Sequence, residues 1–177
     1  MLKKNKKILV VTERRADFSR FKPILDLIKK DKTIQYSLVV TGIHLIKKYG
    51  YSVNEIKESK HKIYKSFKMY ENVTIKNDDG ASMVAALGKA VTELSKIVKE
   101  IKPDVILSGF DIAANFAVTI VGAHMNIPVA HIQGGEVSGT IDESIRHAMS
   151  KFSHYHLVSN SDAKKRLIKM GEIKKNI

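Results

Sequence analysis

The chain has 177 residues, of which 44% are hydrophobic and 28% charged, a usual size and composition for one folded globular domain. It contains no cysteine, so disulfide scaffolds, thiolate nucleophiles, zinc ribbons and iron–sulfur clusters are excluded. The formal net charge of +13 raises nucleic acid or an acidic membrane surface as a partner. No apolar run approaches a membrane span, and the lysine-rich start leads into a strand-sized apolar run, so we expect a cytoplasmic protein.

Short apolar and β-branched segments alternate with longer segments of helical periodicity. Strands are expected over Lys7–Thr12, Gln35–Thr41, Lys62–Phe67, Asp104–Ser108, Ile127–Ile132 and His156–Ser159. Helices are expected around Phe18–Ile28, after Ser52, over Met83–Ile101, over Ala113–Met125, after Thr140 and over Asp162–Met170. The alternation predicts a Rossmann-like α/β domain of three layers, with a mostly parallel sheet between helices, because parallel strands need crossover connections.

Polar residues and stop signals mark the ends of several expected helices. Asp17 is placed to cap the first helix. Ser52 with Glu55, and Thr140 with Glu143, have the spacing of a capping box. The long helix is expected to close at Lys102-Pro103 and the last one at Gly171.

Ligands of an open parallel sheet gather outside the carboxyl ends of its strands, so the residues after each strand are candidate site residues. Arg15 follows the first strand and precedes a helix, which suits a phosphate or carboxylate, although a solvated basic loop fits as well. No G-x-G-x-x-G fingerprint occurs there, which argues against a dinucleotide cofactor. His44 follows the second strand, where a structural histidine is the plainer interpretation, and Asp111 follows the fourth, where it also fits a simple N-cap.

The most informative segment is HIQGGEVSGTIDESIRH, residues 131–147, which starts at the end of the fifth strand. Its three glycines let the backbone approach a ligand closely. The polar side chains around them are His131, Gln133, Glu136, Asp142, Arg146 and His147. A helix start beside such a loop offers several donors to an anionic or hydroxyl-rich ligand. For single residues two plainer interpretations remain: His131 as a core histidine, and Asp142 with Arg146 as an i,i+4 surface pair.

Three segments together resemble the N-terminal half of the hydrolysing UDP-N-acetylglucosamine 2-epimerases: TERRADFS (12–19), TGIHLIKKYG (41–50) and the segment 131–147. The resemblance runs through nearly the whole chain. It implies two Rossmann-like domains in the GT-B arrangement, with the sugar nucleotide in the cleft between them. Residues 1–177 would then form the N-terminal domain, and a second domain outside them would hold most of the nucleotide. Such enzymes make N-acetylmannosamine, or a relative, for sialic-acid-like sugars.

The implied reaction eliminates the nucleotide from C1, leaves an unsaturated glycal and adds water to give a free sugar inverted at C2, with no metal or redox cofactor. This path needs a carboxylate base, a group that delivers water or a proton, and cations for the departing diphosphate. Carried over by motif, the acid/base candidates are Asp111, Glu136 and Asp142. Arg15 and Ser19 would face the phosphates or the sugar, and His44, Arg146 and His147 would line or brace the site.

The chain departs from the family pattern at two places near these residues. Relatives usually have Gly-Asp-Arg after the fourth strand, whereas this chain has Gly109-Phe110-Asp111-Ile112, so the arginine is missing. Gln133 occupies a catalytic position where relatives have a glutamate, and an amide cannot take a proton. A different UDP- or GDP-linked sugar, such as a diacetamido-bacillosamine derivative, accounts for both changes. The alternative is a non-catalytic nucleotide-sugar-binding or regulatory module.

The distribution of basic residues argues against nucleic acid. They are spread over helix faces such as Lys57/Lys60 and Lys164/Lys165/Arg166 and over the tail Lys3–Lys7, with no tryptophan and no aromatic interleaving. We therefore expect a nucleotide-sugar substrate, and neither nucleic acid nor a membrane as a partner. The long apolar helix Met83–Ile101 leaves a homo-oligomer open, with core packing as its other use.

Overall fold

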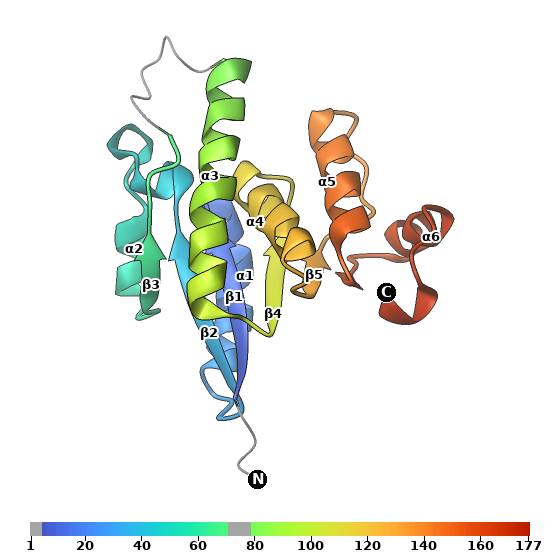
Figure 1. The fold of residues 1–177 in the computed structure, drawn as a ribbon, viewed down its shortest axis with the longest axis horizontal. Helices are drawn as coiled ribbons and strands as arrows, with labels where there is room; N and C mark the ends of the chain where they lie inside the picture. The colour runs from blue at the N-terminus through green and yellow to red at the C-terminus, as the bar shows by residue number, and fades with distance from the viewer. Residues whose placement is uncertain (1–4, 71–78) are drawn as a thin grey trace.

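The computed structural model describes residues 5–70 and 79–177, which form an α/β structure around a six-stranded sheet (Figure 1). The strands are β1 (Lys6–Thr12), β2 (Ile34–Val40), β3 (Ile63–Ser66), β4 (Val105–Gly109), β5 (Val129–Ile132) and β6 (Tyr155–Leu157). The α-helices are α1 (Arg15–Ile28), α2 (Val53–Glu58), α3 (Gly80–Ile101), α4 (Ala113–His124), α5 (Ile141–Phe152) and α6 (Ser161–Lys169). Short 3-10 helices lie at η1 (Gly42–Leu45), η2 (Lys47–Tyr49) and η4 (Lys174–Asn176).

The strands lie in the order β3-β2-β1-β4-β5-β6, and every pairing between neighbours is parallel. The chain moves outward from β1 to β3, and then returns through α3 to place β4 on the other side of β1. The loops after β1 and β4 therefore lead away in opposite directions, which is the switch point where open sheets of this type bind ligands. The Rossmann-like prediction is confirmed, and the described sheet is parallel throughout.

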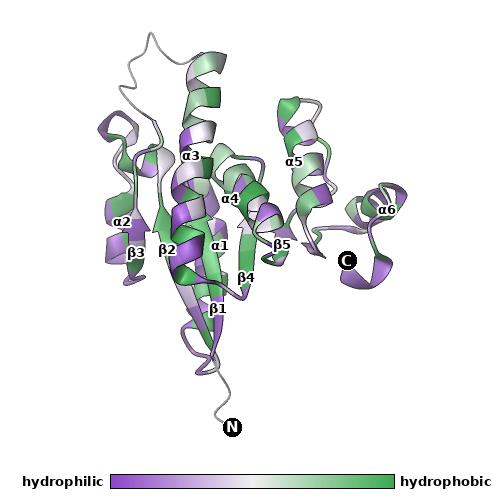
Figure 2. Cartoon of the chain, viewed as in Figure 1, coloured by the Kyte–Doolittle hydropathy of each residue, from purple (hydrophilic) through white to green (hydrophobic). Residues whose placement is uncertain are grey.

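Alternate residues of the strands build a separate apolar core on each face of the sheet. Leu9 and Val11 pack with residues of α3 and α4 on one face, whereas Val10 packs with Phe21 and Leu25 of α1 on the other. Figure 1 accordingly shows α3 and α4 in front of the sheet and α1 behind it. In Figure 2 the inner strands are largely green, and the helices mix green with purple. This pattern gives the three expected layers.

The predicted elements agree with the structure to within a few residues. Ala113–Met125 is observed as Ala113–His124, and Asp162–Met170 as Ser161–Lys169. The long helix begins at Gly80 because Asp79 caps it, its Oδ1 accepting the backbone N–H of Ser82 at 2.8 Å. It ends before Lys102, as expected, and Lys102 adopts the left-handed conformation with φ of +50°.

The start of α1 differs from the expected one. The helix begins at Arg15, so Asp17 is its third residue and not the residue that precedes it. From this position the Asp17 carboxylate accepts the backbone N–H groups of Glu13 (2.8 Å) and Arg14 (2.9 Å). The Asp17 side chain therefore caps α1 by accepting backbone N–H groups that precede the helix, and Arg14 is the N-cap residue.

Neither expected capping box forms in full. α2 does follow Ser52, but the Ser52 hydroxyl lies against His44 and Glu55 binds Arg15 instead of the helix start. α5 follows Thr140 as expected, and Glu143 accepts the backbone N–H groups of residues 138 and 139, both at 2.9 Å, in place of that of residue 140. In α2, contacts with other elements thus replace the expected capping box. In α5, the carboxylate of Glu143 caps the residues just before the expected one.

Candidate active site at the carboxyl edge of the sheet

The centre of the site is an ion pair between Asp111, just after β4, and Arg146, in the second turn of α5. Their side chains are 15% and 10% exposed. The other terminal nitrogen of Arg146, Nη1, donates to the backbone oxygen of Glu136 at 2.9 Å. Two segments far apart in the sequence are thereby joined, and the position of the Asp111 carboxylate is fixed.

This ion pair decides between alternatives that the sequence leaves open. The N-cap residue of α4 is Ile112, and the Asp111 carboxylate pairs with Arg146, so the interpretation of Asp111 as a simple N-cap is wrong. The surface pair of Asp142 with Arg146 is wrong as well. Asp142 is exposed, whereas Arg146 is buried and turned toward Asp111.

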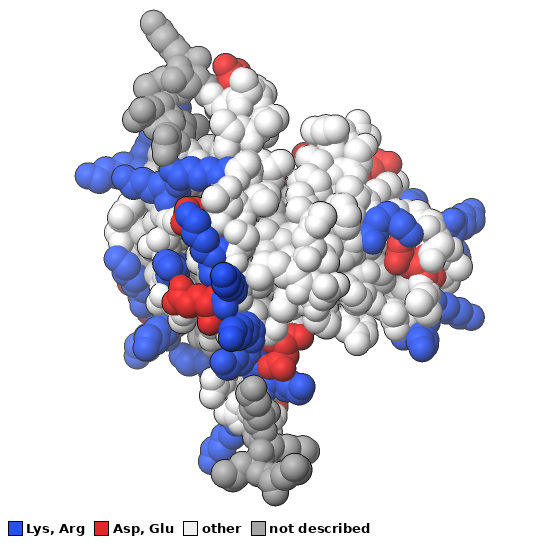
Figure 3. Space-filling model, viewed as in Figure 1, with Lys and Arg blue, Asp and Glu red and all other residues white. Residues whose placement is uncertain are grey.

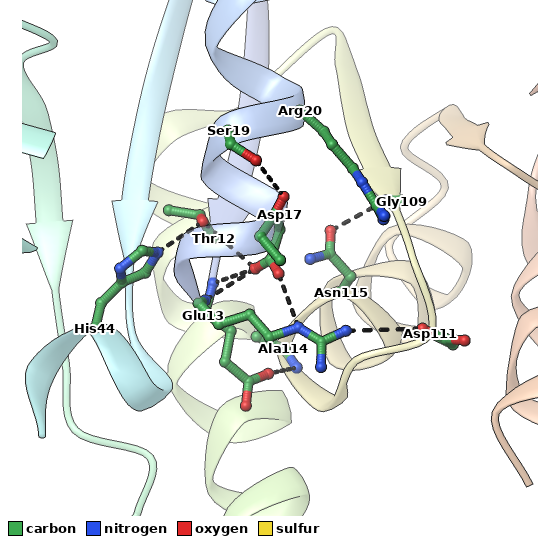
Figure 4. Close-up of polar contacts among 12 residues, drawn as sticks. Thr12, Glu13, Asp17, Ser19, Arg20, His44, Gly109, Asp111, Ala114 and Asn115 are labelled. Carbon is green, nitrogen blue, oxygen red and sulfur yellow. Dashed lines mark hydrogen bonds and ion pairs between the residues drawn. The ribbon is translucent and has the colours of Figure 1, made fainter. Parts of the chain in front are cut away.

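A second arginine, Arg14, approaches Asp111 from the segment after β1. Arg14 places Nη2 4.0 Å from Asp111 Oδ1, and its Nε donates to Asp17 Oδ1 at 3.1 Å. Figure 4 shows these two carboxylates, Asp17 on α1 and Asp111 after β4. Asp17 is buried, and this burial raises the pKa of its carboxyl even though two backbone N–H groups oppose the shift. The Arg14 side chain remains 43% exposed, so its cation is held in place and still open to a ligand.

Arg15 and Ser19 lie on the exposed surface of α1. Arg15 makes a two-pronged contact with Glu55 of α2, in which Nε donates to Oε2 at 2.9 Å and Nη2 meets Oε1. The Ser19 hydroxyl donates to the backbone oxygen of Ala16 at 2.8 Å. Their contact with a substrate stays a prediction. The sequence favours Arg15 as the cation of this loop, but the geometry brings Arg14 to Asp111.

His44 is fully buried and uses both ring nitrogens within the protein. Its Nε2 lies 2.9 Å from Thr12 Oγ1 and its Nδ1 lies 2.7 Å from Ser52 Oγ. Burial lowers its pKa to about 4, because the charged imidazolium is poorly solvated there. His44 therefore ties β1 to η1 and α2. Of the expected roles of lining or bracing the site, this geometry supports bracing.

Glu13 is a buried carboxylate at the same edge that the sequence did not mark as a site residue. Its Oε1 accepts the Tyr70 hydroxyl at 2.7 Å, and its Oε2 accepts the backbone N–H of Ala114, at the start of α4, at 2.9 Å. Burial raises its pKa, although both hydrogen bonds oppose the shift. A Cβ on Gly42 would lie only 2.1 Å from Glu13 Cγ, so the glycine two residues after the end of β2 is the sequence signal for this close approach.

The glycine-rich loop after β5 packs tightly against its neighbours. A Cβ on Gly134 would come within 2.9 Å of His131 Nδ1, and one on Gly135 within 2.5 Å of the backbone oxygen of Ala163. The Glu136 carboxylate accepts a hydrogen bond from the Ser159 hydroxyl, after β6. The glycines thus allow the loop to lie between α5 and α6. In this position the backbone oxygen of Glu136 accepts the hydrogen bond from Arg146.

The remaining residues of this segment serve different roles. His131 is a core histidine, with no exposed surface and its Nδ1 3.2 Å from Ser150 Oγ; burial, with smaller contributions from His156 and Arg146, lowers its pKa to about 3. His147 is partly buried, with Nε2 3.8 Å from Glu143 Oε1. Asp142 stands exposed in the first turn of α5. Within residues 5–70 and 79–177, neither Asp142 nor His147 forms a hydrogen bond or an ion pair with Asp111.

Within residues 5–70 and 79–177, no group of three or more histidine, aspartate or glutamate side chains is arranged to hold a metal ion. In the same part of the chain, no helix combines the length and the apolar character that crossing a membrane would require.

The parallel sheet with carboxylates and arginines at its switch point defines a Rossmann-like domain with a polar ligand edge. The UDP-N-acetylglucosamine 2-epimerase family matches residues 26–177, and the chain belongs to this family. The resemblance seen in the sequence is therefore confirmed.

Individual relatives agree with this assignment. The chain is 40% identical over 172 residues to the UDP-N-acetylglucosamine 2-epimerase of Neisseria meningitidis serogroup B, covering 97% of this chain and 44% of the relative. It is also 40% identical over 172 residues to the UDP-N,N'-diacetylbacillosamine 2-epimerase (hydrolyzing) of Legionella pneumophila, covering 97% and 45%. A crystal structure of Neisseria meningitidis UDP-GlcNAc 2-epimerase bound to UDP-GlcNAc shares the fold, with a TM-score of 0.81 at 20% identity over 96% of this chain and 44% of that one. The chain spans about half the length of the curated relatives it matches.

Proposed function

We propose that the protein is a hydrolysing sugar-nucleotide 2-epimerase and that residues 1–177 form its N-terminal domain in a GT-B arrangement. The observation that carries this proposal is the Asp111 carboxylate, which Arg146 holds at the switch point with Arg14 beside it. A base and cations for a leaving diphosphate are thus close together. Family membership and the names of the 40% identical relatives support the same activity.

The proposed substrate is a UDP- or GDP-linked 2-acetamido sugar. Its C2 hydrogen is not beside a carbonyl, so its removal is coupled to loss of the nucleotide. The C2–H electrons form a C1=C2 double bond while the C1–O bond breaks and its electron pair leaves on the diphosphate. Water then adds its oxygen to C1, and C2 receives a proton on the opposite face. One sugar nucleotide and one water give one nucleoside diphosphate and one free sugar with C2 inverted.

Asp111, Glu136 and Asp142 are the acid/base candidates for these steps, and Asp111 has the best-defined position. Arg146 fixes it, and it faces the cation that would receive the diphosphate. Glu136 is engaged by Ser159, and Asp142 lies on the first turn of α5. Arg14 and Arg15 are the cations of the β1 loop, while His44 and His147 brace or line its surroundings.

The experiment that tests this proposal uses the complete protein with UDP-N-acetylglucosamine, UDP-N,N'-diacetylbacillosamine and their GDP counterparts. Nuclear magnetic resonance in D₂O should show a nucleoside diphosphate and a free sugar appearing in equal amounts, with C2 inverted and carrying deuterium. Deuterium at C2 distinguishes addition to a glycal from simple hydrolysis, because hydrolysis leaves the C2 hydrogen in place. If none of these compounds releases an inverted sugar, the proposed activity is refuted.

We further propose that the reaction precedes the formation of sialic-acid-like sugars and takes place in the cytoplasm. Support comes from a relative named polysialic acid biosynthesis protein P7 from Escherichia coli, which is 30% identical over 168 residues. The diacetylbacillosamine names of two other relatives favour a diacetamido sugar as the substrate to test first.

A second candidate function, a non-catalytic nucleotide-sugar-binding module, is favoured by Gln133. Its side-chain oxygen Oε1 accepts from Arg20 at 3.3 Å, and the amide cannot act as a base. On this alternative the complete protein binds UDP without turnover, and Gln133→Glu introduces activity. Turnover by the protein with Gln133 in place excludes it.

A further inference from the structure

Two residues with left-handed backbone lie side by side at the carboxyl edge of the sheet. Phe110 directly follows β4 with φ of +65°, and Gln133 directly follows β5 with φ of +62°. β4 and β5 are neighbours in the sheet, with Gly109 paired to Ile132. Neither residue type favours this conformation, so the surrounding contacts must hold it.

Arg20 of α1 contacts both of these residues. Its guanidinium carbon lies 4.9 Å from the centre of the Phe110 ring, and Nη1 donates to Gln133 Oε1 at 3.3 Å. Figure 4 shows Arg20 extending from α1 toward Gly109 and the loop that carries Asp111. Phe110 and Gln133 are therefore joined by Arg20, a residue from a third element.

The charge of Arg20 is not compensated by these partners. Three of the five arginines, Arg14, Arg15 and Arg146, contact carboxylates, and Arg166 donates to the backbone oxygen of Gly135. Arg20 is exposed, and no carboxylate of the described residues lies within ion-pair distance of it. An aromatic face and an amide oxygen orient the guanidinium but leave its full charge for a ligand. A glutamate at position 133 would neutralise it.

We propose that Arg20 is a further substrate-binding residue, oriented by Phe110 and Gln133, that binds the diphosphate of the nucleotide sugar; this rests on the proposed function. Residues 110–112, which follow the end of β4, contain no arginine, and Arg20 supplies a cation to this loop from α1. A guanidinium binds two phosphate oxygens at once, and its effect grows as negative charge develops on the leaving diphosphate. Gln133 is then required to keep this cation free.

The test combines UDP binding by calorimetry with the kinetics of sugar release, both on the complete protein. Arg20→Met keeps the aliphatic stem and removes the charge, and we expect the Kd for UDP to rise about tenfold. Gln133→Glu should weaken UDP binding to a similar extent by pairing with Arg20. In the Gln133→Glu background, Arg20→Met should then add less than about twofold. Arg20→Lys should recover part of the loss.

Lys22→Met is the matched control, because it removes one positive charge from the same helix where Lys22 already pairs with Asp26 at 2.7 Å. It should leave the Kd for UDP within about twofold of the wild-type value. If the wild type releases sugar and Arg20→Met binds UDP normally, or if Lys22→Met weakens binding equally, the Arg20 proposal is overturned and the epimerase proposal stands. If the wild type gives no turnover but UDP binding still depends on Arg20, the epimerase proposal fails and the Arg20 site remains. Failure of the wild type to bind UDP or GDP overturns both.

Discussion

At the scale of single residues, the pair of Asp111 and Arg146 links the stability of the site to its chemistry. Both side chains are largely buried, and removing one partner leaves the other charge unpaired. Arg146→Met should therefore lower the free energy of unfolding by roughly 3 kcal/mol and abolish sugar release. Urea unfolding and the sugar-release assay on the complete protein measure the two effects.

Asp111→Asn separates the chemical role from the positional one, because the amide keeps the shape and can still accept from Arg146. We expect turnover to fall by about 10²–10⁴-fold, the usual contribution of a general base. Asp142→Asn, on the exposed first turn of α5, should lower turnover by a smaller factor than Asp111→Asn does. A larger loss in Asp142→Asn than in Asp111→Asn would show that Asp111 is not the base.

The buried histidines predict how stability depends on pH. The pKa of His44 is lowered to about 4 and that of His131 to about 3, whereas a histidine in the unfolded chain has a pKa near 6.5. Below pH 6.5 the unfolded chain binds protons that the folded protein does not, so the free energy of unfolding falls as pH decreases from 6.5 toward 4. Each histidine contributes a slope of up to about 1.4 kcal/mol per pH unit in this window. Urea unfolding at a series of pH values measures it.

A variant isolates the part due to His44, because other groups titrate in the same range. Burial raises the pKa values of Glu13 and Asp17, so these carboxyls act in the opposite direction and stabilise the folded state as pH falls. His44→Gln retains a polar side chain between Thr12 and Ser52 and removes the proton site. In His44→Gln the free energy of unfolding should depend less steeply on pH, by up to about 1.4 kcal/mol per pH unit, the contribution of one histidine. An unchanged slope would contradict the assignment.

At the scale of elements, the glycines of the loop after β5 determine where α6 can pack. Gly135 has φ of +80°, and a Cβ there would lie 2.5 Å from the backbone oxygen of Ala163 in α6. Gly135→Ala should therefore destabilise the protein by about 2–4 kcal/mol, from backbone strain and overpacking together. Thermal and urea unfolding measure the loss.

Gly139 provides the matched control for this substitution. Its φ is +70°, but nothing lies within 4 Å of an added Cβ, so Gly139→Ala imposes backbone strain alone. Its cost should stay near 1 kcal/mol. Equal losses in the two variants would show that the contact with α6 is unimportant.

The start of α1 shows which features of the site the sequence predicts and why it does not predict the others. Apolar periodicity predicts the strands, helices and layers, because these depend on which face each residue buries. The location of the site at the strand ends follows from the same topology. Which arginine faces Asp111 depends on where α1 begins, and Asp17 caps it from the third position, so Arg14 and not Arg15 reaches Asp111. Glu13 has no local signature, since its partners come from Tyr70 and α4.

At the scale of the whole molecule, the positive charge on the face seen in Figure 3 is divided between separate regions. In Figure 3 the lysines and arginines gather beside α2 and α3 and around α6, while the face over α4 and α5 between them carries almost none. A nucleic-acid backbone is bound by a continuous basic surface, which this face does not offer. The nearly uncharged surface on this face, together with the exposed side chains of Met83 and Val84 on α3, keeps the prediction of a homo-oligomer open.

Since the site lies at the open edge of the sheet, the last prediction concerns residues 1–177 alone. Asp111, Arg146 and Arg14 belong to one wall of the proposed cleft, and the relatives are about twice as long. Without a second wall, water stays at the glycal position and half of the diphosphate contacts are missing, so sugar release should be slower than in the complete protein by about 10³-fold or more. Circular dichroism and a cooperative unfolding transition establish that the isolated domain is folded, and adding the separately produced remainder of the protein should restore activity. Release of inverted sugar by residues 1–177 within tenfold of the complete protein would refute the two-domain cleft.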